Sequence, residues 1–172
     1  DMETGRRKML VAIATGTGKT FTMVNQVYRL MKAGVAKRIL FLVDRRALAA
    51  QAVRAFSSHE PEPGLKFDQA YELYSQKFRR EDFDEGEAFD PQVLPSSYLL
   101  EPSAGHAFVY VCTIQRMRVN LFGWESAFET TASEPEREED AGELNIPIHA
   151  FDVVIADECH RGYTAAEISK WR

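Results

Sequence analysis

The 172-residue sequence has few cysteines and no long apolar run. Its two cysteines, Cys112 and Cys159, lie far apart and form no metal-binding pattern. No apolar run approaches the length of a membrane span. We expect no secretory signal, because the first apolar run is strand-like, and no internal repeat is visible. These features indicate a globular, intracellular protein with reduced thiols.

The net charge of −5 is unevenly distributed. Residues 79–90 carry a net charge of −4 and residues 133–143 carry −5, which leaves +4 on the rest of the chain. A mildly basic body with two acidic segments is compatible with a nucleic-acid partner but does not by itself favour one. The apolar content of 45% over this length is sufficient for the core of one domain.

A glycine-rich stretch at residues 14–20, Ala-Thr-Gly-Thr-Gly-Lys-Thr, lies between an apolar run and an amphipathic stretch. Strand, glycine turn and helix are the context of a phosphate-binding loop. We expect residues 15–20 to bind ATP, with backbone N–H groups converging on the phosphates. The residues are Thr15, Gly16, Thr17, Gly18, Lys19 and Thr20.

Two of these residues have specific expected roles. Lys19 would reach the β- and γ-phosphates, and the Thr20 hydroxyl would hold Mg²⁺. Ile13 stands where the general pattern has its first glycine, so a strict match fails. The alternative is a chance glycine turn between a strand and a helix.

Hydrophobic patterning predicts an α/β fold with a mainly parallel sheet and helices on both faces. The apolar runs lack alternation, as in strands that are covered on both sides. The expected strands are residues 7–14, 39–43, 107–112 and 152–156, and the expected helices are residues 19–32, 47–56 and about 114–122.

The pattern is weaker between these elements. Residues 66–71 are compatible with a short strand or turn, and residues 69–78 with a helix. We expect acidic surface insertions near 79–103 and 123–145, where prolines and charges are frequent.

An acidic pair, Asp157 and Glu158, follows the last expected strand. Ligands of parallel α/β sheets bind beyond the carboxyl ends of the strands, so this pair would emerge beside the phosphate loop. There Asp157 could hold Mg²⁺ through water, while Glu158 orients and deprotonates the attacking water. The alternative is a helix N-cap with a first-turn acid. Together with the loop, the pair favours ATP hydrolysis.

These motifs resemble those of a known family. Residues 14–20 are similar to motif I, and Asp-Glu-Cys-His at 157–160 to motif II, of superfamily 2 helicase-type ATPases. Residues 39–45, Thr-Ile-Gln at 113–115 and residues 157–163 extend the resemblance to the R subunit of type I restriction–modification enzymes. An apolar residue at position 13 also fits that family.

The resemblance implies that residues 1–172 are a fragment containing the first RecA-like motor domain, a P-loop ATPase domain that uses ATP and Mg²⁺. The whole enzyme would move duplex DNA before cleaving it, with the nuclease on an earlier domain outside this chain. The implied partners are duplex DNA, the methyltransferase and specificity subunits, and a second RecA-like domain, in the prokaryotic cytoplasm.

The same resemblance implies roles for four further residues. Arg45 in motif Ia, with Thr113 and Gln115 in motif Ib, would face the DNA backbone. His160 would sense the nucleotide state and relay it to the second motor domain. The alternatives are a solvated helix start at Arg45 and a helix N-cap at Thr113.

Three other functions remain open at this point. One is a type III restriction subunit, and the second is another superfamily 2 DNA helicase. The third is a non-catalytic nucleotide-binding interaction module, against which Glu158 argues because such a module needs no water-activating carboxylate.

Titration calorimetry tests the phosphate loop. We expect the chain to bind Mg·ATP and Lys19→Ala to lose that binding, because the ammonium group would contact the phosphates. Alone, the chain would bind weakly and hydrolyse ATP very slowly, since a second motor domain supplies arginine fingers in such motors. Equal affinity of parent and variant would place the nucleotide elsewhere.

Overall fold

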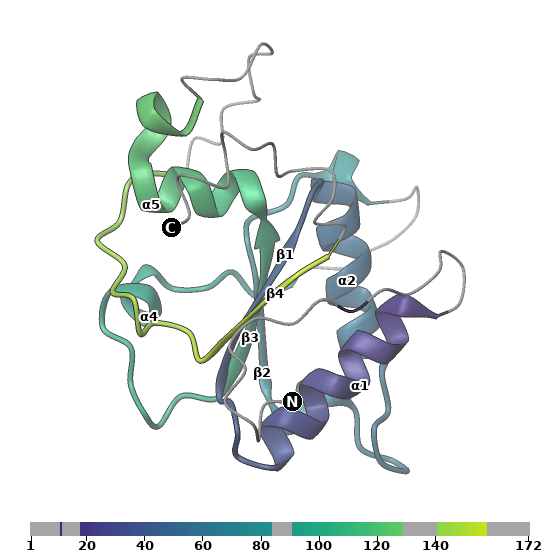
Figure 1. The fold of residues 1–172 in the computed structure, drawn as a ribbon. Coiled ribbons are helices and arrows are strands. Elements are labelled where there is room, and N and C mark those ends of the chain that lie inside the picture. The colour runs from purple at the N-terminus through teal and green to yellow at the C-terminus, as the bar shows by residue number, and fades with distance from the viewer. Residues whose placement is uncertain (1–10, 12–17, 84–90, 129–140, 158–172) are drawn as a thin grey trace.

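The computed structural model describes residues 11, 18–83, 91–128 and 141–157. Four strands of this part of the chain form one parallel sheet, in the order β2-β3-β1-β4 (Figure 1). They are β1 (Arg38–Val43), β2 (Glu72–Ser75), β3 (Phe108–Thr113) and β4 (Val153–Ala156). The predicted α/β class with a parallel sheet is therefore confirmed. Except for Val11, the strand expected at residues 7–14 lies outside the described residues.

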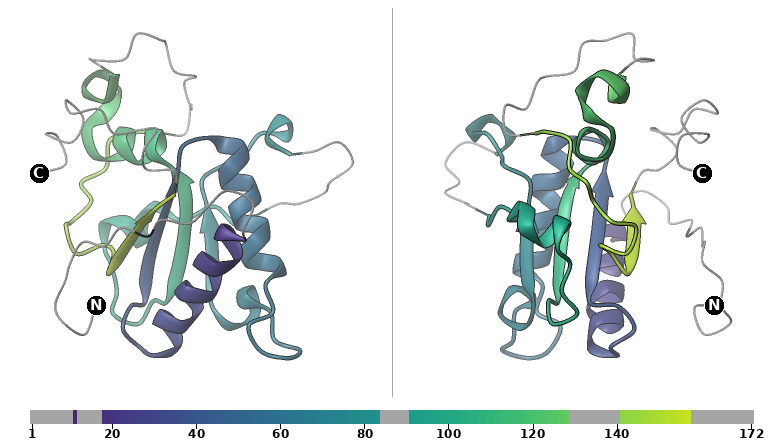
Figure 2. Two further views of the ribbon diagram at one scale, coloured as in Figure 1. Left: turned by 45° about the vertical axis from the view of Figure 1, so that its right-hand side comes forward. Right: turned by 90° about the vertical axis from the view of Figure 1, so that its left-hand side faces the viewer.

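Helices cover both faces of the sheet (Figure 2). On one face lie α1 (Lys19–Lys32) and α2 (Arg46–Ser58), and on the other α4 (Ser96–Leu100) and α5 (Ile114–Phe128). A short helix α3 (Phe67–Ala70) precedes β2, and a 3₁₀ turn η2 (Arg80–Asp82) follows it. In the described part of the chain, no helix has both the length and the apolar character needed to cross a membrane.

The apolar runs of the strands divide between two cores. In β1, Ile39, Phe41 and Val43 pack under α1 and α2, where Phe56 meets Phe41 edge to face at 5.5 Å between ring centroids. Leu40 and the other alternate residues pack under α4 and α5. A strand covered on both faces needs apolar residues at every position, which explains the absence of alternation in the sequence.

The helix considered for residues 69–78 is wrong. The helical segment α3 ends at Ala70, and β2 begins two residues later. Leu73 and Tyr74 point into opposite cores, and Ser75 is fully buried beside β3. Pairing with β3 decides this structure, because so short a run carries too little periodicity to distinguish strand from helix.

The described residues near the two expected insertions make ordered contacts. The Ser75 N–H donates to the Gln92 carbonyl at 2.8 Å, and the Leu94 N–H donates to the Ser75 carbonyl at 3.1 Å. Leu94 is buried, and so is Leu99 on α4. Residues 92–94 therefore pair with the last residue of β2, and Leu94 and Leu99 add to the second core.

Helix α5 is longer than the predicted span to residue 122. It reaches Phe128 after a break at Gly123, whose φ of 73° lies in the left-handed region that favours glycine. Asn120 Nδ2 donates to the Gly142 carbonyl at 2.8 Å, and Trp124 Nε1 donates to the Ala141 carbonyl at 2.9 Å. These bonds attach the end of the second acidic segment to α5.

A carboxylate joins the amino ends of β1 and β4. Asp152 accepts hydrogen bonds from the backbone N–H groups of Lys37 and Arg38, at 3.0 and 2.9 Å, and from the Arg38 guanidinium at 2.7 Å. Burial by itself raises the pKa of Asp152, but the hydrogen bonds from Arg38 and Lys37 outweigh it and lower the pKa to about 2. The folded state therefore favours the ionised carboxylate.

This low pKa predicts an acid-dependent contribution to stability. The unfolded pKa is near 3.9, so the contribution is present above about pH 4 and is lost as the pH falls through about 2. We expect Asp152→Asn to lower the free energy of unfolding by about 1 kcal/mol at pH 7 and by much less below pH 2. The value at pH 7 takes into account that solvent screens the partly exposed carboxylate. Urea denaturation at both pH values measures this. Glu101→Gln, at an exposed carboxylate, is the control. A loss that is equal at both pH values would contradict the assignment.

Candidate functional site

The carboxyl ends of three neighbouring strands bring the predicted motifs to one edge of the sheet. In the register, Val43 of β1 lies opposite Thr113 of β3, and Leu42 lies opposite Ala156 of β4. The Asp157 N–H donates to the Leu42 carbonyl at 2.8 Å, which extends the pairing by one residue. Ligands of parallel sheets bind at this edge, so the motifs are placed where a ligand could contact them together.

Helix α1 begins at the end of the glycine-rich stretch. Gly18 precedes it with φ 80° and ψ 30°, a left-handed conformation that other residues rarely adopt. Its carbonyl accepts the first helical hydrogen bond, from the Thr22 N–H at 2.9 Å. The glycine-rich stretch therefore leads directly into the positive end of α1, where Lys19 and Thr20 are the first two residues. Thr15, Gly16 and Thr17 lie outside the described residues.

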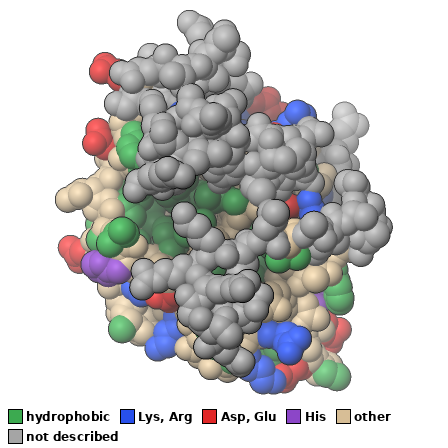
Figure 3. Space-filling view, viewed as in Figure 1, with side chains coloured by type: hydrophobic (Ala, Val, Ile, Leu, Met, Phe, Trp, Pro, Cys, Tyr) green, Lys and Arg blue, Asp and Glu red, His purple; other side chains and the backbone are tan. Residues whose placement is uncertain are grey.

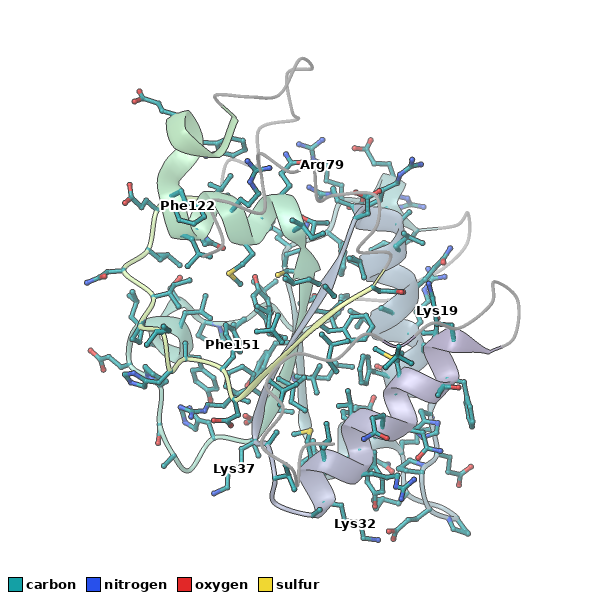
Figure 4. All side chains as sticks on the ribbon, in the orientation of Figure 1. Lys19, Lys32, Lys37, Arg79, Phe122 and Phe151 are labelled. Carbon is teal, nitrogen blue, oxygen red and sulfur yellow. The ribbon has the colours of Figure 1, made fainter. Side chains whose placement is uncertain are left out.

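An ion pair connects the two motifs at opposite ends of the sequence. Lys19 Nζ lies 2.7 Å from Asp157 Oδ1, and the two side chains are 23% and 19% exposed. Lys19 extends from the first residue of α1 beside the end of β4 (Figure 4). The sequence predicted that these residues share a site, and the structure places them in direct contact.

One oxygen donor of this pair, and another adjacent to it in sequence, are of the kind that suits a small, hard cation. Asp157 supplies a carboxylate, and Thr20, the residue after Lys19, supplies a hydroxyl. Mg²⁺ usually takes one or two protein oxygens and completes its octahedron with phosphates and water. In the described ranges, no three His, Cys, Asp or Glu side chains gather as a metal cage. The residues present therefore fit Mg²⁺ bound together with a nucleotide.

Two consecutive arginines at the end of β1 have different environments. The side chain of Arg45 is 70% exposed and lies 3.5 Å from Asp44. Arg46 instead forms a bidentate pair with Asp82, with Nη2 at 2.8 Å from Oδ2, and these side chains are only 17% and 10% exposed. Arg45 is therefore the one whose guanidinium faces outward, as a contact with an external phosphate requires.

At the end of β3, Thr113 is used within the protein. It is 2% exposed, and its Oγ1 accepts a hydrogen bond from the Arg116 N–H at 3.1 Å. The N-cap alternative is therefore confirmed for this hydroxyl. Gln115 lies in the first turn of α5 and is partly exposed.

Sequence analysis missed two residues at this edge. Gln76 is 1% exposed, and its Oε1 accepts the Thr113 N–H at 2.7 Å. Asp82 is the carboxylate that holds Arg46. Both follow β2, which the sequence did not predict, and neither belongs to a motif. Glu158 and His160 lie outside the described residues and remain predictions.

The N-cap at Thr113 predicts a measurable stability effect. Thr113→Val keeps the shape of the side chain but removes the acceptor for the Arg116 N–H, so the free energy of unfolding should fall by about 1 kcal/mol. Thr113→Ser keeps the hydroxyl and should retain most of the stability. Chemical denaturation measures both variants. A valine variant as stable as the parent would show that the cap is unimportant.

Comparisons with known proteins agree with this geometry. The model of the family described as "Type III restriction enzyme, res subunit" matches residues 1–172. The endonuclease subunit of the type I restriction enzyme EcoKI, from Escherichia coli K12, is 29% identical over 159 residues, which is 92% of this chain. The corresponding EcoAI subunit from Escherichia coli is 29% identical over 168 residues, or 98% of this chain. No solved structure matches.

The chain spans only about a tenth to a seventh of these relatives, 10% of the EcoKI subunit and 15% of the EcoAI subunit. The resemblance to helicase-type restriction subunits, which rested on motifs, is confirmed by the family match and by both relatives. With the family model matching along its whole length, the chain belongs to the family of the res subunit of type III restriction enzymes.

Proposed function

We propose that this chain is the first motor domain of a type I restriction endonuclease R subunit, which hydrolyses Mg·ATP to move duplex DNA. The observation that carries the proposal is the contact between Lys19 and Asp157 at the carboxyl edge of the sheet. Both relatives named above are type I endonuclease subunits. Because the chain covers a small share of them, translocation and cleavage by the whole protein belong to the proposal.

Nucleotide binding would begin with an exchange of partners at Lys19. In the structure its ammonium group neutralises Asp157. The phosphates of ATP would replace Asp157 as the partner of Lys19 and would also accept hydrogen bonds from the N–H groups of residues 15–20. Asp157 would then be available to bind a cation. Asp157 and Thr20 would hold Mg²⁺, which supplies positive charge to the phosphate oxygens.

Hydrolysis would need the neighbouring carboxylate. Glu158 would accept a proton from the water whose oxygen attacks the γ-phosphorus, as the bond to the ADP oxygen breaks. His160, two residues further on, would report the nucleotide state to the second motor domain. Lys19 stabilises negative charge on the transferred phosphoryl group in the same step.

DNA would lie across the same edge. On the face drawn in Figure 3, Lys and Arg side chains are interspersed with Asp and Glu side chains rather than gathered in one basic area. At the proposed edge too, Asp44 lies beside Arg45 and Asp82 beside Arg46, so binding would depend on a few well-placed groups. Arg45 and Gln115 would contact backbone phosphates, and Thr113 would hold the start of α5 through its N-cap. Methyltransferase and specificity subunits would be the protein partners, in the cytoplasm.

The family description favours a second candidate, the motor domain of a type III restriction subunit. Both candidates use the same ATP site. The order of the domains around this chain in the full-length protein would separate them, because a nuclease domain preceding the motor would support the type I assignment.

Glu158→Gln tests catalysis apart from binding. In the full-length protein we expect DNA-stimulated ATP hydrolysis to fall about 10²- to 10⁴-fold, the usual contribution of a general base, while Mg·ATP binding is retained. Glu101→Gln, at an exposed carboxylate after α4, is the matched control and should hydrolyse ATP normally. Full activity of Glu158→Gln would favour a non-catalytic nucleotide-binding module instead.

A further inference from the structure

Residues 76–82 follow β2 and overlap the start of the first acidic segment. They contact Thr113, in one motif that is expected to face DNA, and Arg46, which directly follows the other. At the amino end of this 76–82 segment, the Gln76 N–H donates to the Val111 carbonyl at 3.2 Å, and Gln76 Oε1 accepts the Thr113 N–H at 2.7 Å. The side chain of Gln76 thus extends the pairing of β2 with β3 by one step. It holds the residue that caps α5.

The other end of the 76–82 segment holds the start of α2. Arg46 Nε and Nη2 donate to the Asp82 carboxylate at 2.8 to 3.1 Å, and Nη2 also donates to the Lys77 carbonyl at 3.2 Å. Asp82 in addition accepts the Arg79 N–H at 2.6 Å, which closes the 3₁₀ turn. Bidentate arginine–carboxylate pairs fix orientation as well as distance.

The segment lies at the same end of the sheet as the candidate site. Figure 4 places Arg79 close to where α2 and α5 begin, whereas Lys32 and Lys37 lie at the opposite end. Arg45 directly precedes Arg46, and Gln115 is two residues after Thr113. The two proposed DNA-contacting side chains are therefore each within two residues of a group that the 76–82 segment holds.

We propose that the 76–82 segment sets the spacing between Arg45 and Gln115, so that both contact phosphates of one DNA duplex. Gln76 and Asp82 are then positioning residues for DNA binding. Phosphates have a fixed spacing along a strand, so two contacts form together only if the protein holds them at a matching separation. This inference rests on the proposed function and adds a role for a segment that no motif covers.

Two neighbouring carboxylates provide a test in which charge and positioning predict opposite results. Asp82→Asn and Glu81→Gln each remove one negative charge from this edge. Glu81 is 69% exposed and lies 3.3 Å from Arg79, whereas the contact with Arg46 is made by Asp82, so the Glu81 variant leaves that contact intact. Charge alone would make both variants bind DNA more tightly.

In the full-length protein we expect Glu81→Gln to bind duplex DNA as tightly as the parent or more tightly. Asp82→Asn should bind about 5- to 10-fold more weakly, with a shallower dependence of affinity on salt concentration because one phosphate contact is lost. Binding is measured at several salt concentrations, together with the DNA concentration that half-stimulates ATP hydrolysis. Melting temperature and Mg·ATP affinity are measured alongside.

Gln76→Met is the second variant, because it keeps the side-chain shape but removes the acceptor for the Thr113 N–H. It too should weaken DNA binding while Mg·ATP still binds. If Asp82→Asn behaves like Glu81→Gln, the positioning role is overturned and the motor assignment stands. If both positioning variants lose Mg·ATP affinity along with DNA affinity, the segment merely supports the fold and the inference fails. If DNA does not stimulate the parent, the proposed function fails first.

Discussion

Parallel pairing of β1 with β3 on one side and β4 on the other determines where each candidate residue lies. Because parallel strands end at the same edge, Asp44, Thr113 and Asp157 emerge as neighbours although the sequence separates them widely. An antiparallel β4 would carry Asp157 to the opposite edge. The buried, unalternating strands provide the stability of this arrangement, since both faces pack against helices.

The ion pair of Lys19 and Asp157 depends on that pairing and on the start of α1. Its side chains are partly buried, so the attraction is less screened than at an open surface. Each charge is also the group that a phosphate or a divalent cation would need. In this arrangement Lys19 and Asp157 neutralise each other. Binding of a ligand would replace their mutual ion pair with contacts of Lys19 to phosphate and of Asp157 to a cation.

The side of this edge that we propose to face DNA is organised differently. Of two adjacent arginines, Arg46 is held inside the protein by Asp82 and Arg45 is left exposed. Likewise Thr113 is buried as a cap, while Gln115 is partly exposed. In both pairs a residue held within the protein lies close to a more exposed one. Charges of both signs lie at this edge, with Asp44 beside Arg45 and Asp82 beside Arg46, so placement of a few groups matters more here than overall charge.

The sequence by itself determined the α/β class, three of the four described strands, the longer helices, and the proximity of Lys19 to Asp157. Those features are local or strongly patterned: uninterrupted apolar runs, a glycine before a helix, and an acid at the end of a strand. Only the tertiary structure decided that residues 72–75 form a strand, that Arg46 pairs with Asp82 while Arg45 is exposed, and that Gln76 holds Thr113. The physical reason is that each of these features depends on partners 31 to 37 residues away, such as Asp82 and Lys77 for Arg46. A short stretch of sequence has no periodic pattern that identifies such distant partners.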